Sequence, residues 1–142
     1  MDTSNTIQLQ VGVKAFIRRA DGKFLLLKRA EAFEGETEPR WDIPGGRIEP
    51  GEPIRQALER EIKEETGLTL DSVQAVLEAQ DILRVSGRHV VRITFLATIK
   101  DGEMKLDPVE HSDARWVTLA ELNQLHHDMY LDPVISHPLL VK

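Results

Sequence analysis

The sequence predicts an α/β sandwich built of mixed strands and two or three helices. Three features lead to this fold class: segments whose apolar residues recur at every second position, one central segment with helical periodicity, and further short segments of both kinds. The length of 142 residues suits one folding unit, so residues 1–142 are expected to form a single domain.

The N-terminal third of the chain is expected to hold two strands. Residues 11–17 alternate between apolar and other side chains, which is typical of a strand. Asp21-Gly22 is a tight-turn dipeptide, and residues 23–28 are expected to return from it as the second strand of a hairpin. An acidic loop over 31–40 follows, and Pro44-Gly45-Gly46 is expected to interrupt regular structure.

A helix is predicted from about Pro53 to Thr66. Ile54, Leu58 and Ile62 recur every four residues, which places them on one helix face. Pro53 suits a first helical turn because its missing N–H is not needed there. Gly67 is a suitable C-terminal stop.

The C-terminal half is expected to return to strands. Alternating apolar residues predict long strands at 73–83 and 88–100, joined by a hairpin turn at Ser86-Gly87. Three shorter elements are expected after them: a strand at 103–106, a strand at 114–118 and a helix at 119–125.

The composition limits the kind of partner. With 18 basic and 24 acidic residues the net charge is −6, so nucleic acid and anionic membranes are not expected partners. The absence of cysteine excludes disulfides and cysteine-based zinc sites. Residues 1–5 lack the apolar core of a signal peptide, and no run of about 18 apolar residues could span a bilayer. A cytoplasmic protein is therefore expected.

Three glutamates on the central helix suggest a metal site. Glu61, Glu64 and Glu65 share one face, and that face overlaps the stripe of apolar residues. Like charges beside a buried stripe lose hydration and repel one another unless a cation compensates them. Magnesium prefers carboxylate oxygens. The alternative is a solvated acidic face in which Arg60 and Glu64 form an ordinary i, i+4 pair.

The segment containing these glutamates resembles the Nudix box. That pattern is a Gly, five residues, a Glu, seven residues, Arg-Glu, an aliphatic residue, any residue, Glu-Glu, any residue, Gly and an aliphatic residue. Every defined position is filled here, by Gly46, Glu52, Arg60, Glu61, Ile62, Glu64, Glu65, Gly67 and Leu68. The resemblance to Nudix hydrolases implies an α/β/α sandwich in which the box forms a loop, a helix and a second loop.

The same resemblance implies roles for the box residues. The carbonyl of Gly45 is an implied metal ligand, because glycines let a backbone approach a cation closely. Glu64 and Glu65 are the implied main ligands, and Glu61 is either a ligand or the base that orients water. Arg60 and Glu52 are implied to form a structural salt bridge that ties the loop to the helix.

Beyond the box, the chain is most similar to the MutT-like branch that acts on nucleoside triphosphates. This similarity makes Arg29, Arg47 and Arg88 candidates for substrate binding, and Glu110 a candidate for an extra catalytic metal ligand. Each could instead be an ordinary surface charge. Trp116 lies among apolar residues and is expected in the core.

One position departs from the MutT pattern. Leu131 stands where that branch uses an asparagine to read guanine, and leucine cannot hydrogen-bond through its side chain. Asp132 could read a base instead, or it could cap the final helix. The histidines show no zinc-binding spacing and are expected at the surface.

The resemblance implies magnesium-dependent hydrolysis of a pyrophosphate bond, with manganese able to substitute. The expected substrate is a small-molecule nucleotide, a ribo- or deoxyribonucleoside triphosphate that yields the monophosphate and pyrophosphate. The alternatives are an ADP-ribose or nucleotide-sugar pyrophosphatase and a non-catalytic nucleotide sensor on the same scaffold. The resemblance also admits a homodimer.

Overall fold

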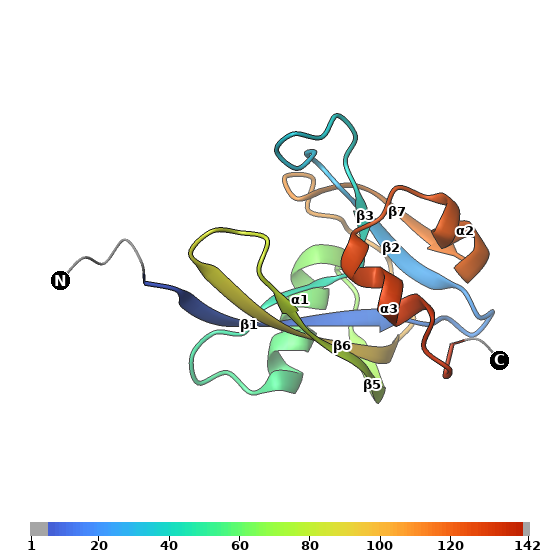
Figure 1. Ribbon diagram of the computed structural model, residues 1–142. Coiled ribbons are helices and arrows are strands. Elements are labelled where there is room, and N and C mark those ends of the chain that lie inside the picture. The colour runs from blue at the N-terminus through green and yellow to red at the C-terminus, as the bar shows by residue number, and fades with distance from the viewer. Residues whose placement is uncertain (1–5, 141–142) are drawn as a thin grey trace.

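The computed structural model of the protein describes residues 6–140 (Figure 1). Met1–Asn5, where a signal core is missing from the sequence, and residues 141–142 lie outside the described part. The strands form a four-stranded sheet of order β4-β1-β6-β5 and a three-stranded sheet of order β3-β2-β7. Their bounds are β1 Gln8–Ile17, β2 Phe24–Arg29, β3 Trp41–Asp42, β4 Gly45–Arg47, β5 Leu70–Ile82, β6 Arg88–Ile99 and β7 His111–Val117.

The four-stranded sheet is mixed, as predicted. β1 and β6 pair in parallel from Gln8↔Arg88 to Ile17↔Ala97. β4 and β5 are added to them antiparallel, one at each edge. Successive side chains of β1 point to the two faces of the sheet, as in any strand. Because β1 lies inside the sheet, it has a neighbouring strand on each side.

Both faces of the strand layer are buried. In β2, Phe24 to Leu27 are all at most 3% exposed, which is typical of a strand covered on both sides. Leu25 and Leu27 join a core cluster with Ala57, Leu58 and Ile62 of α1 (Ile54–Thr66). Phe24 and Leu26 join a second cluster with residues of α2 (Leu119–Gln124) and α3 (Asp132–Ile135).

The helices therefore lie on opposite sides of the strands, and Figure 1 shows α1 and α3 separated by β1 and β6. This arrangement confirms the expected α/β/α sandwich. A short 3-10 helix, η2 (Met129–Leu131), leads directly into α3. No helix within residues 6–140 has both the length and the apolar character needed to cross a bilayer.

The predicted central helix is confirmed to within one residue. Pro53 has extended backbone and immediately precedes α1, which begins at Ile54. Gly67 ends the helix in the left-handed conformation with φ 74°, and its N–H donates to the carbonyl of Lys63. The long hairpin is also confirmed, since β5 and β6 pair through ten residues of register.

Three local predictions were wrong. Residues 103–106 contain no strand. β2 does not return along β1, because the two share only the bridge Arg18↔Phe24 before β2 enters the other sheet. Gly45 and Gly46 do not interrupt the strands but form most of β4, where they pair with Lys14 and Val13.

Candidate active site

Glu65 is the most buried of the three clustered glutamates, with 7% of the residue exposed. Its Oε1 accepts a hydrogen bond of 3.3 Å from the backbone N–H of Gly45, and its Oε2 lies 3.9 Å from Nε2 of His111. Burial, followed by the nearby Glu61, raises the pKa of Glu65 to about 8, although Lys14 acts in the opposite direction. A bound cation would stabilise the ionised form of this carboxyl group.

Glu61 and Glu64 share one guanidinium. Nη1 of Arg60 donates to Glu61 at 2.9 Å and to Glu64 at 3.3 Å. The Glu61 side chain is 14% exposed, whereas that of Glu64 is 59% exposed. The expected burial beside the apolar stripe therefore holds for Glu61 and Glu65, while Glu64 faces outward in the i, i+4 pair that the alternative interpretation described.

Arg60 also makes the predicted structural salt bridge. Its Nε and Nη2 donate to the two carboxylate oxygens of Glu52 at 2.7 and 2.9 Å. Nη2 donates in addition to the carbonyl of Arg47 at 3.0 Å. The hydrogen bonds from Arg60 lower the pKa of Glu52 to about 2. This network fixes the loop after β4 against the glutamate face of α1.

The two glycines of β4 bring the backbone close to these carboxylates. Gly45 has φ 144°, a conformation that side-chain-bearing residues rarely adopt. A Cβ atom on Gly46 would stand 2.6 Å from the carboxylate of Glu61, so any larger residue would displace that group from its present position. The carbonyl of Gly45 lies close to a cation, because Nζ of Lys14 is 3.1 Å from the carbonyl of Ile43, 3.4 Å from Asp42 and 3.5 Å from the Gly45 carbonyl.

These donors suit a hard divalent cation, since they are carboxylates and one peptide carbonyl. Within residues 6–140, no three His, Asp or Glu side chains already converge on one point. Glu64 is turned toward Arg60 rather than toward Glu65. Its exposed side chain would have to rotate away from Arg60 to complete a cation site.

A cleft of about 220 Å³ opens beside Gly46, on the face of the four-stranded sheet opposite α1. Strands β1, β4 and β6, the ends of β2, β3 and β5 and the loops near Phe33 and Arg84 supply its walls. Its lining residues are Gly12, Val13, Lys14, Arg29, Phe33, Asp42, Gly46, Arg47, Ile82, Arg84, Val85, Val90 and Arg92. The cleft is thus rich in basic side chains.

The structure brings two of the predicted substrate-binding residues into this cleft. Arg29 and Arg47 both line it. Nε of Arg29 is buried without a hydrogen-bond partner within the described residues, and its guanidinium lies 4.2 Å from the ring centre of Phe33. A buried donor of this kind suits an acceptor that the substrate supplies.

The other predicted residues lie elsewhere. Arg88 is exposed at the start of β6 and does not line the cleft. Asp132 neither lines the cleft nor caps α3, since it accepts from Nε2 of His127 at 2.7 Å. Leu131, next to it, is 2% exposed in the hydrophobic core. Glu110 is exposed in the turn before β7, where its carbonyl accepts from the N–H of Ala30.

Several residues of the site were not predicted from the sequence. Lys14, Asp42, Arg84 and Arg92 carry no local pattern that distinguishes them from ordinary charged residues. His111 was expected at the surface, which was wrong, because it is 9% exposed beside Glu65. Its burial lowers its pKa to about 4.

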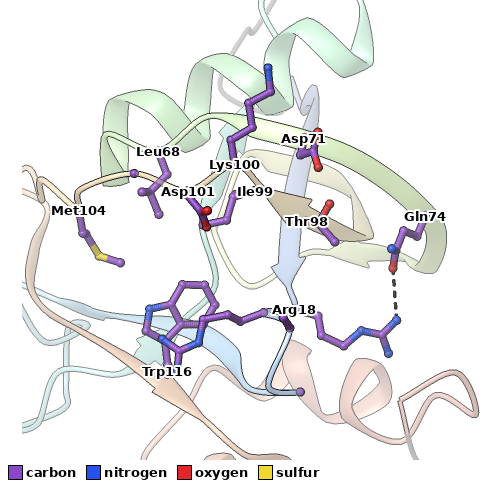
Figure 2. Close-up of a pocket in the computed structure, with 14 residues that line it drawn as sticks. Arg18, Leu68, Asp71, Gln74, Thr98, Ile99, Lys100, Asp101, Met104 and Trp116 are labelled. Carbon is purple, nitrogen blue, oxygen red and sulfur yellow. Dashed lines mark hydrogen bonds between the residues drawn. The ribbon is translucent and has the colours of Figure 1, made fainter.

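A larger cavity of about 760 Å³ lies near the opposite end of β1 (Figure 2). Trp116 forms part of its wall, with the guanidinium of Arg19 4.6 Å from the ring centre. Trp116 is half-buried: it packs against the core cluster beneath α1 but also faces this cavity, so the expected core position holds only in part. None of the clustered glutamates lines this cavity, so it is distinct from the candidate active site.

Comparison with known proteins agrees with this geometry. The sequence model of the NUDIX domain matches residues 8–137. This chain belongs to the Nudix family. Nudix hydrolases generally use a divalent metal ion, which fits the oxygen-donor set beside Gly45.

The Nudix relatives that match this chain are named for different activities. The chain is 36% identical over 118 residues to an ADP-ribose pyrophosphatase of Methanocaldococcus jannaschii, covering 81% of this chain and 63% of that protein. It is 34% identical over 118 residues to the nucleoside triphosphatase NudI of Escherichia coli, covering 77% of this chain and 81% of that protein. It spans only 26% of a nudix hydrolase of Caenorhabditis elegans.

The fold of the family is shared as well. A crystal structure of a MutT NUDIX hydrolase from Burkholderia pseudomallei superposes with a TM-score of 0.79 at 32% identity. The match covers 92% of this chain and 98% of that one. The first curated relatives are longer than the matched region, and this chain accounts for less than two thirds of their length.

Proposed function

We propose that this chain hydrolyses the pyrophosphate linkage of a nucleotide, with a nucleoside triphosphate as substrate and the monophosphate and pyrophosphate as products. One observation carries the proposal. Glu61 and Glu65 approach the β4 glycines at the edge of a cleft lined by Arg29 and Arg47. The carboxylates for a cation and the guanidinium groups for phosphates thus lie on the two sides of the same glycine strand. The 34% identity to a nucleoside triphosphatase supports the choice of substrate.

We propose magnesium as the metal, with manganese able to substitute for it. The carbonyl of Gly45 and the carboxylates of Glu61, Glu64 and Glu65 would hold it, and Glu110 would contribute an additional ligand from its turn. When bound, the metal supplies charge neutralisation at the phosphates and a lower pKa for the attacking water.

The protein's own side chains would position the substrate. Arg29 and Arg47 would donate charge-assisted hydrogen bonds to phosphate oxygens, which are stronger than hydrogen bonds between neutral groups. Glu61 would accept the proton of the attacking water, with Glu110 as the second candidate for this role. Arg60 would orient the Glu61 carboxylate through the hydrogen bond that it already donates.

A second activity is favoured by one comparison. The 36% identity to an ADP-ribose pyrophosphatase makes ADP-ribose, and by extension nucleotide sugars, the alternative substrate class. The non-catalytic sensor is the less favoured alternative, because all the box carboxylates are present and Glu65 is held in place by Gly45. A single domain, a cytoplasmic location and a homodimer stay predictions, as does the absence of nucleic-acid and membrane partners.

The test combines a substrate panel with one charge-neutral substitution. Nucleoside triphosphates, ADP-ribose and nucleotide sugars are incubated with and without magnesium, and the products are identified by chromatography. Glu64→Gln should lower kcat/KM by orders of magnitude without unfolding the protein, because its side chain is exposed. Glu59→Gln, an exposed position on the same helix that is paired with Arg55, is the matched control.

The outcomes separate the alternatives. Release of pyrophosphate from a triphosphate supports the proposal. Cleavage of ADP-ribose but of no triphosphate would instead assign the chain to the ADP-ribose pyrophosphatases. Magnesium-independent binding without any product indicates the sensor. A Glu64→Gln variant that turns over at the wild-type rate contradicts the assignment of the metal site.

A further inference from the structure

The floor of the cleft is one row of residues across the four-stranded sheet. Arg47 of β4 pairs with Gly12 of β1, and Gly12 pairs with Arg92 of β6. Residues that pair directly point to the same face, so the two arginines flank Gly12 at two strand spacings, roughly 10 Å between their backbones. Gly12 has no side chain, so the floor between the arginines is bounded by the side chain of Val90, which would lie 3.5 Å from a Cβ atom on Gly12.

Guanidinium groups already cover the aromatic rings around the cleft. Arg84 lies 5.0 Å from the ring centre of Tyr130 and 5.0 Å from that of Phe33. Arg92 lies 5.8 Å from the ring centre of Tyr130, and Arg29 lies 4.2 Å from that of Phe33. Because guanidinium groups cover these rings, a ligand in the cleft would meet N–H donors and not bare aromatic faces.

The basic side chains around the cleft are only partly neutralised. Three of them have carboxylate partners: Lys14 with Asp42 at 3.4 Å, Arg40 with Glu36 at 2.7 Å and Arg84 with Asp128 at 2.8 Å. Arg29, Arg47 and Arg92 form no ion pair with any residue between 6 and 140. Positive charge therefore accumulates here although the chain carries a net charge of −6.

Within residues 6–140, Asp42 is the one lining side chain that can accept a hydrogen bond from a base N–H, and its two oxygens already accept from Lys14 and from the N–H of Ile43. The side-chain hydrogen-bond donors of the lining are all cationic. No asparagine, glutamine, serine or threonine occurs among the lining residues of the described chain. The cationic side chains of the lining bind anionic oxygens well but cannot accept a hydrogen bond from a base N–H.

Building on the proposed function, we infer that the cleft selects nucleotides carrying a second phosphoryl group on the sugar. Arg29 and Arg47 bind the phosphates next to the glutamates. Arg92 binds the additional phosphoryl group on the other side of Gly12 from Arg47, supported by Arg84. Arg92 is therefore the residue that determines this specificity.

The test uses two product-like ligands that differ by one phosphoryl group. Binding of adenosine 5′-monophosphate and of adenosine 3′,5′-bisphosphate is measured by calorimetry without metal, so that no turnover is needed. The bisphosphate should bind the wild-type protein about tenfold more tightly or better, as expected for an added charge-assisted contact. Arg92→Leu should bring the ratio of the two dissociation constants close to one.

Two further variants make the result specific. Arg18→Leu removes the same charge at the far end of β1, beside the cavity of Figure 2, and should keep the wild-type ratio. Arg92→Lys retains the charge but loses the paired donors, and it should give an intermediate ratio even if the leucine variant folds poorly.

Failure of the inference can be distinguished from failure of the proposed function. Equal binding of the two ligands by the wild-type protein overturns the inference, as does a preference that Arg92→Leu and Arg92→Lys both retain in full. Neither result affects triphosphate hydrolysis. If no pyrophosphate linkage is cleaved but the tenfold preference is observed, the catalytic proposal fails and the second phosphate site stands.

Discussion

Substituting Gly46 with alanine tests the glutamate site more directly than removing a carboxylate. A Cβ atom at this position would stand 2.6 Å from the carboxylate atoms of Glu61. The backbone of Gly46 does not require glycine, because its φ is not positive. The substitution therefore acts on a flexible side chain while leaving the strand pairing of β4 intact.

The size of the effect follows from the distance. An ordinary van der Waals contact begins at 3.4 Å, so the Glu61 carboxylate must retreat from 2.6 Å by close to 1 Å. A misplacement of about 1 Å in a catalytic arrangement can reduce the rate by about 10²-fold. The stability should change by less than about 1 kcal/mol, because alanine also restricts the unfolded chain.

Two neighbouring substitutions serve as references. Gly45→Ala would place a Cβ atom 2.1 Å from the carbonyl oxygen of Val13 at φ 144°, and backbone cannot yield as a side chain can. We expect it to destabilise the fold by about 2 kcal/mol or more. Gly102→Ala, whose nearest contacts would be 3.6 and 3.9 Å, should change neither stability nor rate.

Thermal unfolding and initial rates of nucleoside triphosphate hydrolysis with magnesium measure the two effects separately. The expected pattern is a stable but slow Gly46→Ala variant and an unstable Gly45→Ala variant. Full activity in Gly46→Ala would show that the position of Glu61 does not matter for the reaction. Wild-type stability in Gly45→Ala would refute the steric reasoning for β4.

Two other predictions concern pH and the base. The pKa of Glu65 is raised from 4.5 to about 8, so the folded protein keeps a proton that the unfolded chain releases. The stability that this group contributes to the metal-free protein is therefore lost as pH rises from about 4.5 to 8, and Glu65→Gln should flatten this pH dependence of the free energy of unfolding in urea. Leu131→Asn places an unpaired amide in the core, and should cost about 3 kcal/mol without any gain in the GTP-to-ATP ratio of kcat/KM. A stable, guanine-selective Leu131→Asn variant would contradict the placement of residue 131 outside the cleft.

Much of the fold was readable from local sequence. The four-residue recurrence with Pro53 before it and Gly67 after it defined α1, because helix periodicity and helix ends are local properties. The pairing of β2 was not readable in this way. Asp21-Gly22 specifies a turn, but whether the chain after it stays in the same sheet depends on which buried face it must cover.

The candidate site also combines features that are local in the sequence with features that depend on the fold. The sequence alone showed the acidic face of α1, and its resemblance to the Nudix box implied the Glu52 to Arg60 bridge, since both lie within one short segment. Only the tertiary structure decided which charges meet. It buried His111 beside Glu65 and placed Arg92 opposite Arg47, because strand pairing joins residues that are distant in the chain and leave no local pattern.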